Sequence, residues 1–302
     1  MNVQNLLDQI EKVDPEVYDR LDSRRKVMHR FSFIGKTLAL AAVPSALGSM
    51  FKKAYGQTTA DITDALLFAY LLENLEAEFY KYVVANAATI GVPAAPAPAL
   101  AALTTIRDHE NSHVTFLRTT LTALGTTPPT YTAARFDFSG GKSAAGTGPF
   151  AAYKTNYGVM LALAQTFEDT GVRAYKGQAP RLISNNDVIQ AALQIHSVEA
   201  RHASHIRYMR RNLASGSLVP SGVTLQPWIT LNQSGIATGN AGADAAIQLS
   251  YNGEEVTMQG NPAANIVNIG GFTIAANEAS EAFDEPLSKA QVTTIVDPFI
   301  IP

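Results

Sequence analysis

Two glutamate–histidine pairs in this chain share one spacing. Glu110 and His113 lie in "RDHENSHVTF", and Glu199 and His202 lie in "VEARHASH". In a helix, residues three apart lie about 60° from each other around the axis, so both side chains of a pair lie on one face. Each pair can therefore reach one metal ion. One such pair is a weak signal, but two pairs in a chain with only six histidines indicate a metal site.

Two further glutamates complete the pattern. Glu73 in "LLENLEAEFY" and Glu168 in "FEDTGVRAY" are each followed seven residues later by a tyrosine, Tyr80 and Tyr175. Seven residues make about two turns, so we expect each tyrosine on the face of its own glutamate. The two halves are offset by 95 residues (73 to 168) and 89 residues (110 to 199). This repeat predicts a pseudo-two-fold site with two metal ions at its midline.

The residue types restrict the chemistry of this site. Four bare carboxylates would be highly unfavourable in an apolar core, and two divalent cations would neutralise them. Carboxylate oxygens with some imidazole nitrogen suit Fe or Mn, and Zn can also bind. Bridging carboxylates would hold two ions close enough to act together on O₂ or peroxide. The chain has no cysteine, which excludes thiolate ligands, disulfides and cysteine catalysis.

Several neighbours of this set have more than one interpretation. Glu76 competes with Glu73, because it lies three residues further along a similar face. The spacing to Tyr80 favours Glu73 as the ligand, with Glu76 beside it. The two tyrosines fit a redox role, a hydrogen bond to a ligand, or plain core packing.

Three more histidines lie close to the two pairs in the sequence. His196 and His205 flank the second pair by one turn on either side, and His109 directly precedes Glu110. We expect His196 and His205 at the surface or beside the ligands, rather than on the metal. We expect His109 to be a packed or solvent-facing neighbour.

The elements that must position these residues are four long helices, predicted near 60–89, 98–124, 149–176 and 185–214. The fourth is expected to begin with Ser184 as N-cap and Asp187 three residues on, a variant of the capping box. Two short connections flank one of about 24 residues. This order predicts an all-α, ferritin-like four-helix bundle at 57–215, with one long crossover between two antiparallel pairs.

Residues 1–56 are expected to be a separate N-terminal segment. Ser23, Arg24 and Arg25 precede an uncharged stretch at 37–51, a pattern that resembles a twin-arginine export signal and would place the protein in the periplasm. Ala54-Tyr55-Gly56 offers a small-residue cleavage site. An amphipathic helix in a cytoplasmic protein is the alternative. The stretch is too short to span a bilayer, so no integral membrane span is expected.

Residues 216–302 are rich in Gly, Asn, Thr and Pro and predict a mostly irregular arm that packs on the bundle or on a partner. We expect a hairpin around Asn252-Gly253 and a short helix that begins with a Ser288–Gln291 capping box and stops at Pro298. The net charge of −3 gives no reason to expect nucleic-acid binding. The basic run 201–211 is expected to be a solvated helix end.

The motifs "LLENLEAEFY", "FEDTGVRAY" and "VEARHASHIR", with "EAFDEPLSKAQV" in the arm, resemble the ferritin-like superfamily, most closely its bacterial branch that includes desiccation-related proteins. The resemblance covers the four helices well, the arm moderately and residues 1–56 hardly at all. It implies six metal ligands: Glu73, Glu110, His113, Glu168, Glu199 and His202. Many di-iron oxygenases of this superfamily have Asp directly before the second-helix and fourth-helix glutamates, where this chain has His109 and Val198.

Three functions follow from this site and this resemblance. The first is a dinuclear Fe or Mn oxidoreductase acting on O₂ or peroxide, as a ferroxidase, a peroxidase or a manganese-catalase-like enzyme. The second is a stress-protective structural protein whose metal site mainly stabilises the bundle. The third, iron storage in a closed cage, is disfavoured by the 87-residue arm at 216–302. Homo-oligomer formation is left open.

Overall fold

The computed structural model describes residues 58–93, 98–213, 216, 218–259, 264–269 and 272–302, all within one compact unit. The segment 1–56, with its predicted export signal, lies outside the described residues, so that interpretation stays a prediction.

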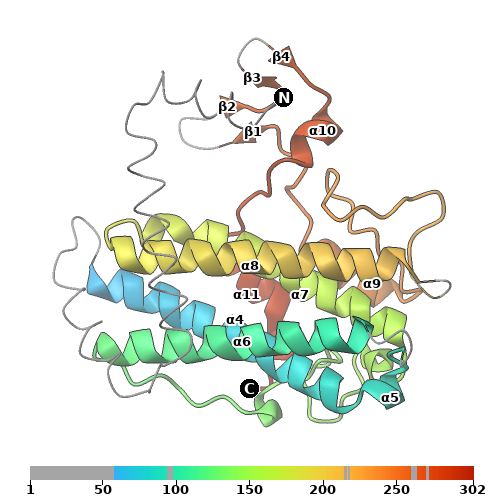
Figure 1. Ribbon diagram of the computed structural model, residues 1–302, viewed down its shortest axis with the longest axis horizontal. Helices are drawn as coiled ribbons and strands as arrows, with labels where there is room; N and C mark the ends of the chain where they lie inside the picture. Colours follow the sequence, from blue (N-terminus) through green and yellow to red (C-terminus); the bar gives the residue numbers. More distant parts are fainter. Residues whose placement is uncertain (1–57, 94–97, 214–215, 217, 260–263, 270–271) are drawn as a thin grey trace. The chain divides into compact units, whose positions relative to one another are not determined.

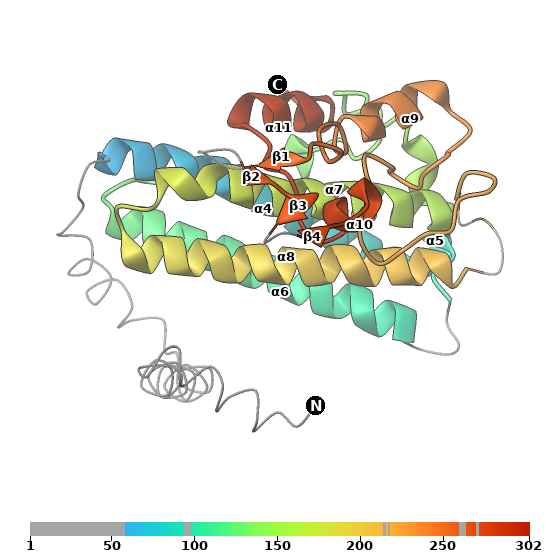
Figure 2. The same ribbon diagram turned by 90° about the horizontal axis from the view of Figure 1, so that it is seen from above.

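Four long helices form a bundle and run side by side in both views (Figures 1 and 2). Helix α4 packs mainly against α6, and α7 packs mainly against α8, as two pairs joined by the long crossover. The predicted all-α bundle is therefore confirmed. Among the described residues, no helix combines the length and apolar character needed to cross a membrane. The helices are α4 (Thr59–Ala85), α6 (Pro98–Ala123), α7 (Tyr157–Gln178) and α8 (Asn186–Arg211), with the short α5 (Ala87–Ile90) after α4 and a 3₁₀ turn (Ala179–Arg181) after α7.

Side-chain caps set where these helices begin. Thr58 and Asp61 form a capping box at the start of α4. Helix α8 begins one residue later than predicted, because the Asn185 side chain accepts a hydrogen bond from the Val188 N–H at 3.1 Å. Ser184 is not the N-cap, and its buried hydroxyl has no hydrogen-bond partner among the described residues. Ser and Asn cap helices about equally well, so their neighbourhood decides between them.

The crossover between α6 and α7 spans residues 124–156 and is longer than predicted, since Asn156 caps α7 at Tyr157. It contains two 3₁₀ turns, Ala133–Arg135 and Ala151–Lys154. Its middle is fixed to the end of the chain. The Asp137 N–H donates to the Phe299 carbonyl at 2.8 Å, and Phe136 forms an isolated β-bridge with Ile300.

The C-terminal arm contains more regular structure than predicted. Helix α11 starts at the expected Ser288–Gln291 capping box and packs on α7. The prediction of a hairpin around Asn252-Gly253 is wrong. Asn240 caps helix α9, which leads directly into this turn, and the first strand begins only at Met258. The arm comprises α9 (Ala241–Gln248), β1 (Met258–Gln259), β2 (Ala264–Asn265), β3 (Asn268–Ile269), β4 (Phe272–Thr273), α10 (Ala276–Ser280), α11 (Lys289–Val296) and a 3₁₀ turn (Asp297–Phe299), with β1–β2 and β3–β4 paired antiparallel.

Two buried arginines of α8 hold this arm on the bundle. Arg207 is only 2% exposed and binds Asp169 of α7, and the same carboxylate accepts a hydrogen bond from Tyr251 of the arm at 2.6 Å. Arg210 is fully buried and donates to the Gly235 carbonyl of the arm at 2.8 Å. The expectation that the whole run 201–211 is a solvated helix end is therefore wrong at these two positions. The arm covers this face of α8 and supplies carbonyl partners that the helix sequence alone does not reveal.

Candidate metal centre

The centre of the bundle is a polar layer between two apolar clusters. One cluster includes Phe79, Leu163 and Ile206, and the other includes Leu66 and Leu117. Along α6 and α8 the predicted site residues separate the two clusters. The apolar packing on both sides fixes the four helices at the height where the polar side chains meet.

All six predicted ligands come together in this layer and are buried. They form two overlapping groups, in each of which one oxygen or nitrogen atom per residue lies within 4.8 Å of the others. Glu110 and Glu199 belong to both groups, which is the arrangement that bridging carboxylates between two ions require. The groups are Glu73, Glu110, His113 and Glu199, and Glu110, Glu168, Glu199 and His202.

Each histidine points its Nδ1 atom at glutamate oxygens. His113 Nδ1 lies 3.0 Å from Glu73 Oε2 and 3.1 Å from Glu110 Oε2. On the other side of the layer, His202 Nδ1 lies 2.8 Å from Glu110 Oε1 and 3.2 Å from Glu168 Oε2. His113 Nδ1 also lies 3.2 Å from Glu199 Oε1, which corresponds to the contact of His202 with Glu110. Each histidine thus contacts the outer glutamate of its own half and the shared glutamate of the other half, as the pseudo-two-fold repeat requires.

Tyr80 and Tyr175 cross between the two helix pairs. Tyr80 of α4 donates to Glu168 Oε1 of α7 at 2.5 Å, and Tyr175 of α7 donates to Glu73 Oε1 of α4. Each tyrosine thus binds the glutamate of the opposite helix, not the one seven residues before it. Each outer glutamate is held by one oxygen and turns the other toward a histidine.

A ferritin-like domain family matches residues 61–212, half of the chain and all four long helices. The chain belongs to this ferritin-like domain family. No curated protein matches the chain, and no solved structure matches it.

The atoms at the centre of this ferritin-like domain fit a metal ion better than they fit one another. Glu168 Oε2, His202 Nδ1 and both carboxylate oxygens of Glu199 are buried, and among the described residues none of them makes a hydrogen bond of ordinary geometry, although His113 and His202 lie close to the carboxylates. Buried polar atoms are normally satisfied, and a set of unsatisfied oxygens with one nitrogen is the donor set that a cation would complete. These residues could therefore hold metal ions.

The shifts in pKa show that the charged carboxylates of this layer are unfavourable without a cation. Burial raises the pKa of Glu110 to about 7, against partial relief from His113 and His202. Burial, and then repulsion from Glu110 and Glu73, raises the pKa of Glu199 well above its ordinary range. Burial alone would lower the pKa of His202, but the nearby carboxylates of Glu168 and Glu110 raise it to about 11.

His109 directly precedes Glu110, at the position where many di-iron oxygenases of the superfamily have Asp, and it contacts the candidate ligand His202. Its Nδ1 lies 2.9 Å from His202 Nε2, and the two rings stack with centroids 5.2 Å apart. With the Nδ1 of His202 directed at the carboxylates, its Nε2–H is left to donate to His109. The expectation that His109 is a packed neighbour missed this contact. The matching position in α8 is Val198, which cannot make it.

Replacing His109 with Phe is expected to weaken the binding of one of the two metal ions by about 10- to 100-fold, because the partner that fixes the ring of His202 is lost. The other ion should keep its affinity. Competition between the protein and a chelator for Mn(II) measures both constants. His205→Phe, at an exposed position on α8, is the matched control. Equal affinities in His109→Phe and wild-type protein would contradict the role of His109.

The other predicted neighbours lie outside the two groups. His196 is half-buried, with its Nδ1 3.0 Å from the Val172 carbonyl oxygen. His205 is exposed. Glu76 is buried beside the layer and is a fifth carboxylate there.

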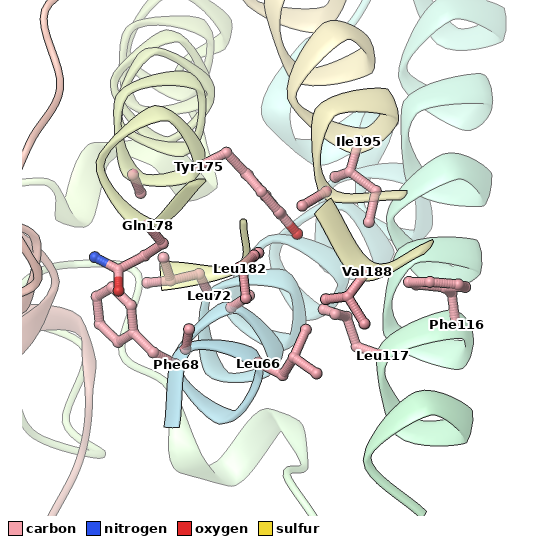
Figure 3. Close-up of a pocket in the computed structure, with 14 residues that line it drawn as sticks. Leu66, Phe68, Leu72, Phe116, Leu117, Tyr175, Gln178, Leu182, Val188 and Ile195 are labelled. Carbon is pink, nitrogen blue, oxygen red and sulfur yellow. The ribbon is translucent and has the colours of Figure 1, made fainter. Parts of the chain in front are cut away.

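An apolar pocket of about 20 Å³ lies between the four helices, beside the metal centre. Figure 3 shows Tyr175 in its wall, among Leu72, Val188 and Ile195. A volume of about 10–15 Å³ is enough for one water molecule, so this pocket takes a molecule of two or three atoms. The hydroxyl group of Tyr175, which binds Glu73, connects the pocket to the metal centre.

Proposed function

We propose that this ferritin-like protein binds two Fe or Mn ions and acts as an oxidoreductase on O₂ or peroxide. The observation that carries the proposal is the pair of overlapping ligand groups that share Glu110 and Glu199. Two divalent ions would neutralise the four carboxylates of the six-residue set and offset the free-energy cost of burying their charges. When bound, the two ions supply the redox chemistry, and the protein supplies orientation.

The chain's own residues would keep this centre dry and ordered. Tyr80 and Tyr175 hold the outer glutamates by one oxygen each, which leaves the second oxygen for a metal. A redox role for either tyrosine stays a prediction. The small apolar pocket beside Tyr175 suits uncharged O₂ better than a hydrated ion.

Metal loading and turnover test the proposal directly. The protein, stripped with a chelator, is loaded anaerobically with Fe(II) or Mn(II), and the bound metal is measured. Two ions per chain are expected, followed by consumption of O₂ with Fe(II) oxidation or by loss of H₂O₂. Trace metal only would end the proposal. Two bound ions without turnover would instead favour the stress-protective role, in which the metal site stabilises the bundle.

Without metal, the free energy of unfolding is expected to fall as the pH rises from about 5 to about 8. The pKa of Glu110 is raised from 4.5 to about 7, and that of His202 from 6.5 to about 11. Between each pair of values the folded protein keeps a proton that the unfolded chain has lost, so raising the pH favours unfolding. The opposite contribution of Glu73, whose pKa is lowered mainly by His113 against the effect of burial, acts around pH 4.5 and below.

Thermal unfolding at several pH values, with chelator or with Mn(II), measures this effect. Mn(II) replaces protons on these ligands, so its stabilising effect should grow with pH. In Glu110→Gln, the fall between about pH 5 and 7 should be smaller, since one of the buried carboxyls that keeps its proton there in the folded protein is gone. A metal-free protein whose stability rises over this range would contradict the assignment.

A further inference from the structure

The pseudo-two-fold repeat is broken at one position in the polar layer that forms the candidate metal centre. Helix α4 carries Glu73 and, three residues later, Glu76. Helix α7 carries Glu168 and, three residues later, Gly171. The offset is again 95 residues (76 to 171), so glycine occupies the position that matches Glu76. The layer therefore holds a fifth carboxylate without a counterpart in the other half.

Glu76 is buried among like charges. Its side chain is 4% exposed, and no hydrogen bond to its carboxylate occurs among the described residues. The charged groups that act on Glu76 most strongly are the carboxylates of Glu199 and Glu73, both candidate ligands, and both repel it. A carboxylate in this position needs a proton or a cation, because nothing else in its surroundings offsets the loss of water.

Gly171 provides the space in which Glu76 and Glu199 approach each other. A Cβ atom at this position would lie 2.9 Å from Glu199 Oε2 and 3.3 Å from Glu76 Oε1. Both oxygens therefore lie against the same bare stretch of α7. Glu199 Oε2 is also one of the buried atoms without a hydrogen-bond partner among the described residues. Because Gly171 has no side chain, nothing from α7 stands between these two carboxylate oxygens.

The other neighbours of Glu76 offer no alternative partner. A cavity of only about 10 Å³ borders both Glu76 and Gly171, and its other walls include Phe167, Thr170 and Val296 of α11. The Thr170 hydroxyl already donates to the Thr166 carbonyl. The polar partners within reach of Glu76 are thus on the side of the metal layer.

We propose that Glu76 is a seventh protein ligand, for the ion held by Glu73, Glu110, His113 and Glu199, and that it makes the two ions inequivalent. The inference rests on the proposed function. Five carboxylates carry one more negative charge than two divalent cations neutralise, and they match one divalent with one trivalent ion. The Glu76 side of the layer therefore favours the more highly charged ion, whereas the other side has His109 behind its histidine.

Replacing Glu76 with Gln, which keeps the shape and removes the charge, tests this ligand. Mn(II) binding is measured by equilibrium dialysis with a competing chelator, and the EPR spectrum is recorded at each loading. We expect one ion to bind at least about tenfold more weakly than in wild type and the other to be unchanged. The metal-free variant should melt at the wild-type temperature or above it. Glu78→Gln is the matched control, since Glu78 lies on the same helix and pairs with Lys81.

The possible outcomes separate this inference from the proposed function. Wild-type affinity for both ions in Glu76→Gln would overturn the seventh ligand, and Glu76 would be a buried, protonated acid. Wild-type protein that binds no Mn(II) would overturn the proposed function and this inference with it. If Glu76→Gln does not fold, Glu76→Asp replaces it, because its shorter carboxylate should weaken the same ion selectively. Unchanged binding in Glu76→Asp would then count against the proposal.

Discussion

Replacing Glu199 with Gln is expected to abolish the binding of both metal ions, whereas Glu168→Gln should weaken only one. Glu199 belongs to both ligand groups, and Glu168 belongs to one. Loss of a residue that merely supports a ligand costs about 10- to 100-fold in affinity, so loss of a shared ligand should cost more than about 100-fold at both sites. Metal per chain after Mn(II) loading and gel filtration measures the difference.

The stability of the metal-free variant separates ligand loss from misfolding. Burial and repulsion from Glu110 make Glu199 unfavourable in the metal-free fold. Removing its charge should therefore leave the melting temperature of the metal-free protein unchanged or higher, while the stabilisation by Mn(II) disappears. Equal metal losses in Glu199→Gln and Glu168→Gln would show that the two groups do not share Glu199.

The helical spacing was sufficient to predict which residues form the candidate metal centre, because each glutamate–histidine pair lies within one helix. Glu110 with His113, and Glu199 with His202, share a face whatever the rest of the fold does. The apolar residues on either side of them give the four helices their register. The same periodicity predicted the bundle, which the structure and the family match both support.

Contacts between helices could not be predicted in the same way. Spacing places Tyr80 on the face of Glu73, but the hydroxyl reaches Glu168, 88 residues away in sequence. The contact between His109 and His202 likewise joins residues 93 apart. One signal was available for Glu76. The 95-residue offset pairs it with Gly171, and a break in an otherwise regular repeat marks where the two halves differ.

The arm was the least predictable part, because its anchors depend on side chains that a helix pattern assigns to solvent. Arg207 belongs to a basic run that reads as an exposed helix end. Its partner Asp169 lies 38 residues earlier, and Tyr251, which donates to the same carboxylate at 2.6 Å, lies in the arm. The basic residues around Arg207 in the sequence therefore predicted an exposed side chain, whereas the side chain is buried.

Replacing Arg207 with Leu is expected to reduce the free energy of unfolding by about 3–5 kcal/mol, because it leaves a buried carboxylate without its cation. Arg207 Nη2 lies 2.5 Å from Asp169 Oδ2, and both side chains are nearly fully buried. Urea unfolding of the metal-free protein measures the loss. Arg211→Leu, at an exposed position four residues further along α8, should change the stability by no more than about 0.5 kcal/mol.

The double variant Asp169→Leu with Arg207→Leu decides how this pair acts. Removing both charges leaves no unpaired ion in the core, so the double variant should lose much less stability than the two single variants together. Tyr251 would lose its acceptor on Asp169 but keep the contact at 3.0 Å with Gln165. A cost for Arg207→Leu as small as that for Arg211→Leu would show that this ion pair does not stabilise the fold. A full cost with strong coupling to Asp169 would show that the buried pair joins α8 to α7, one residue from Glu168 of the candidate metal centre.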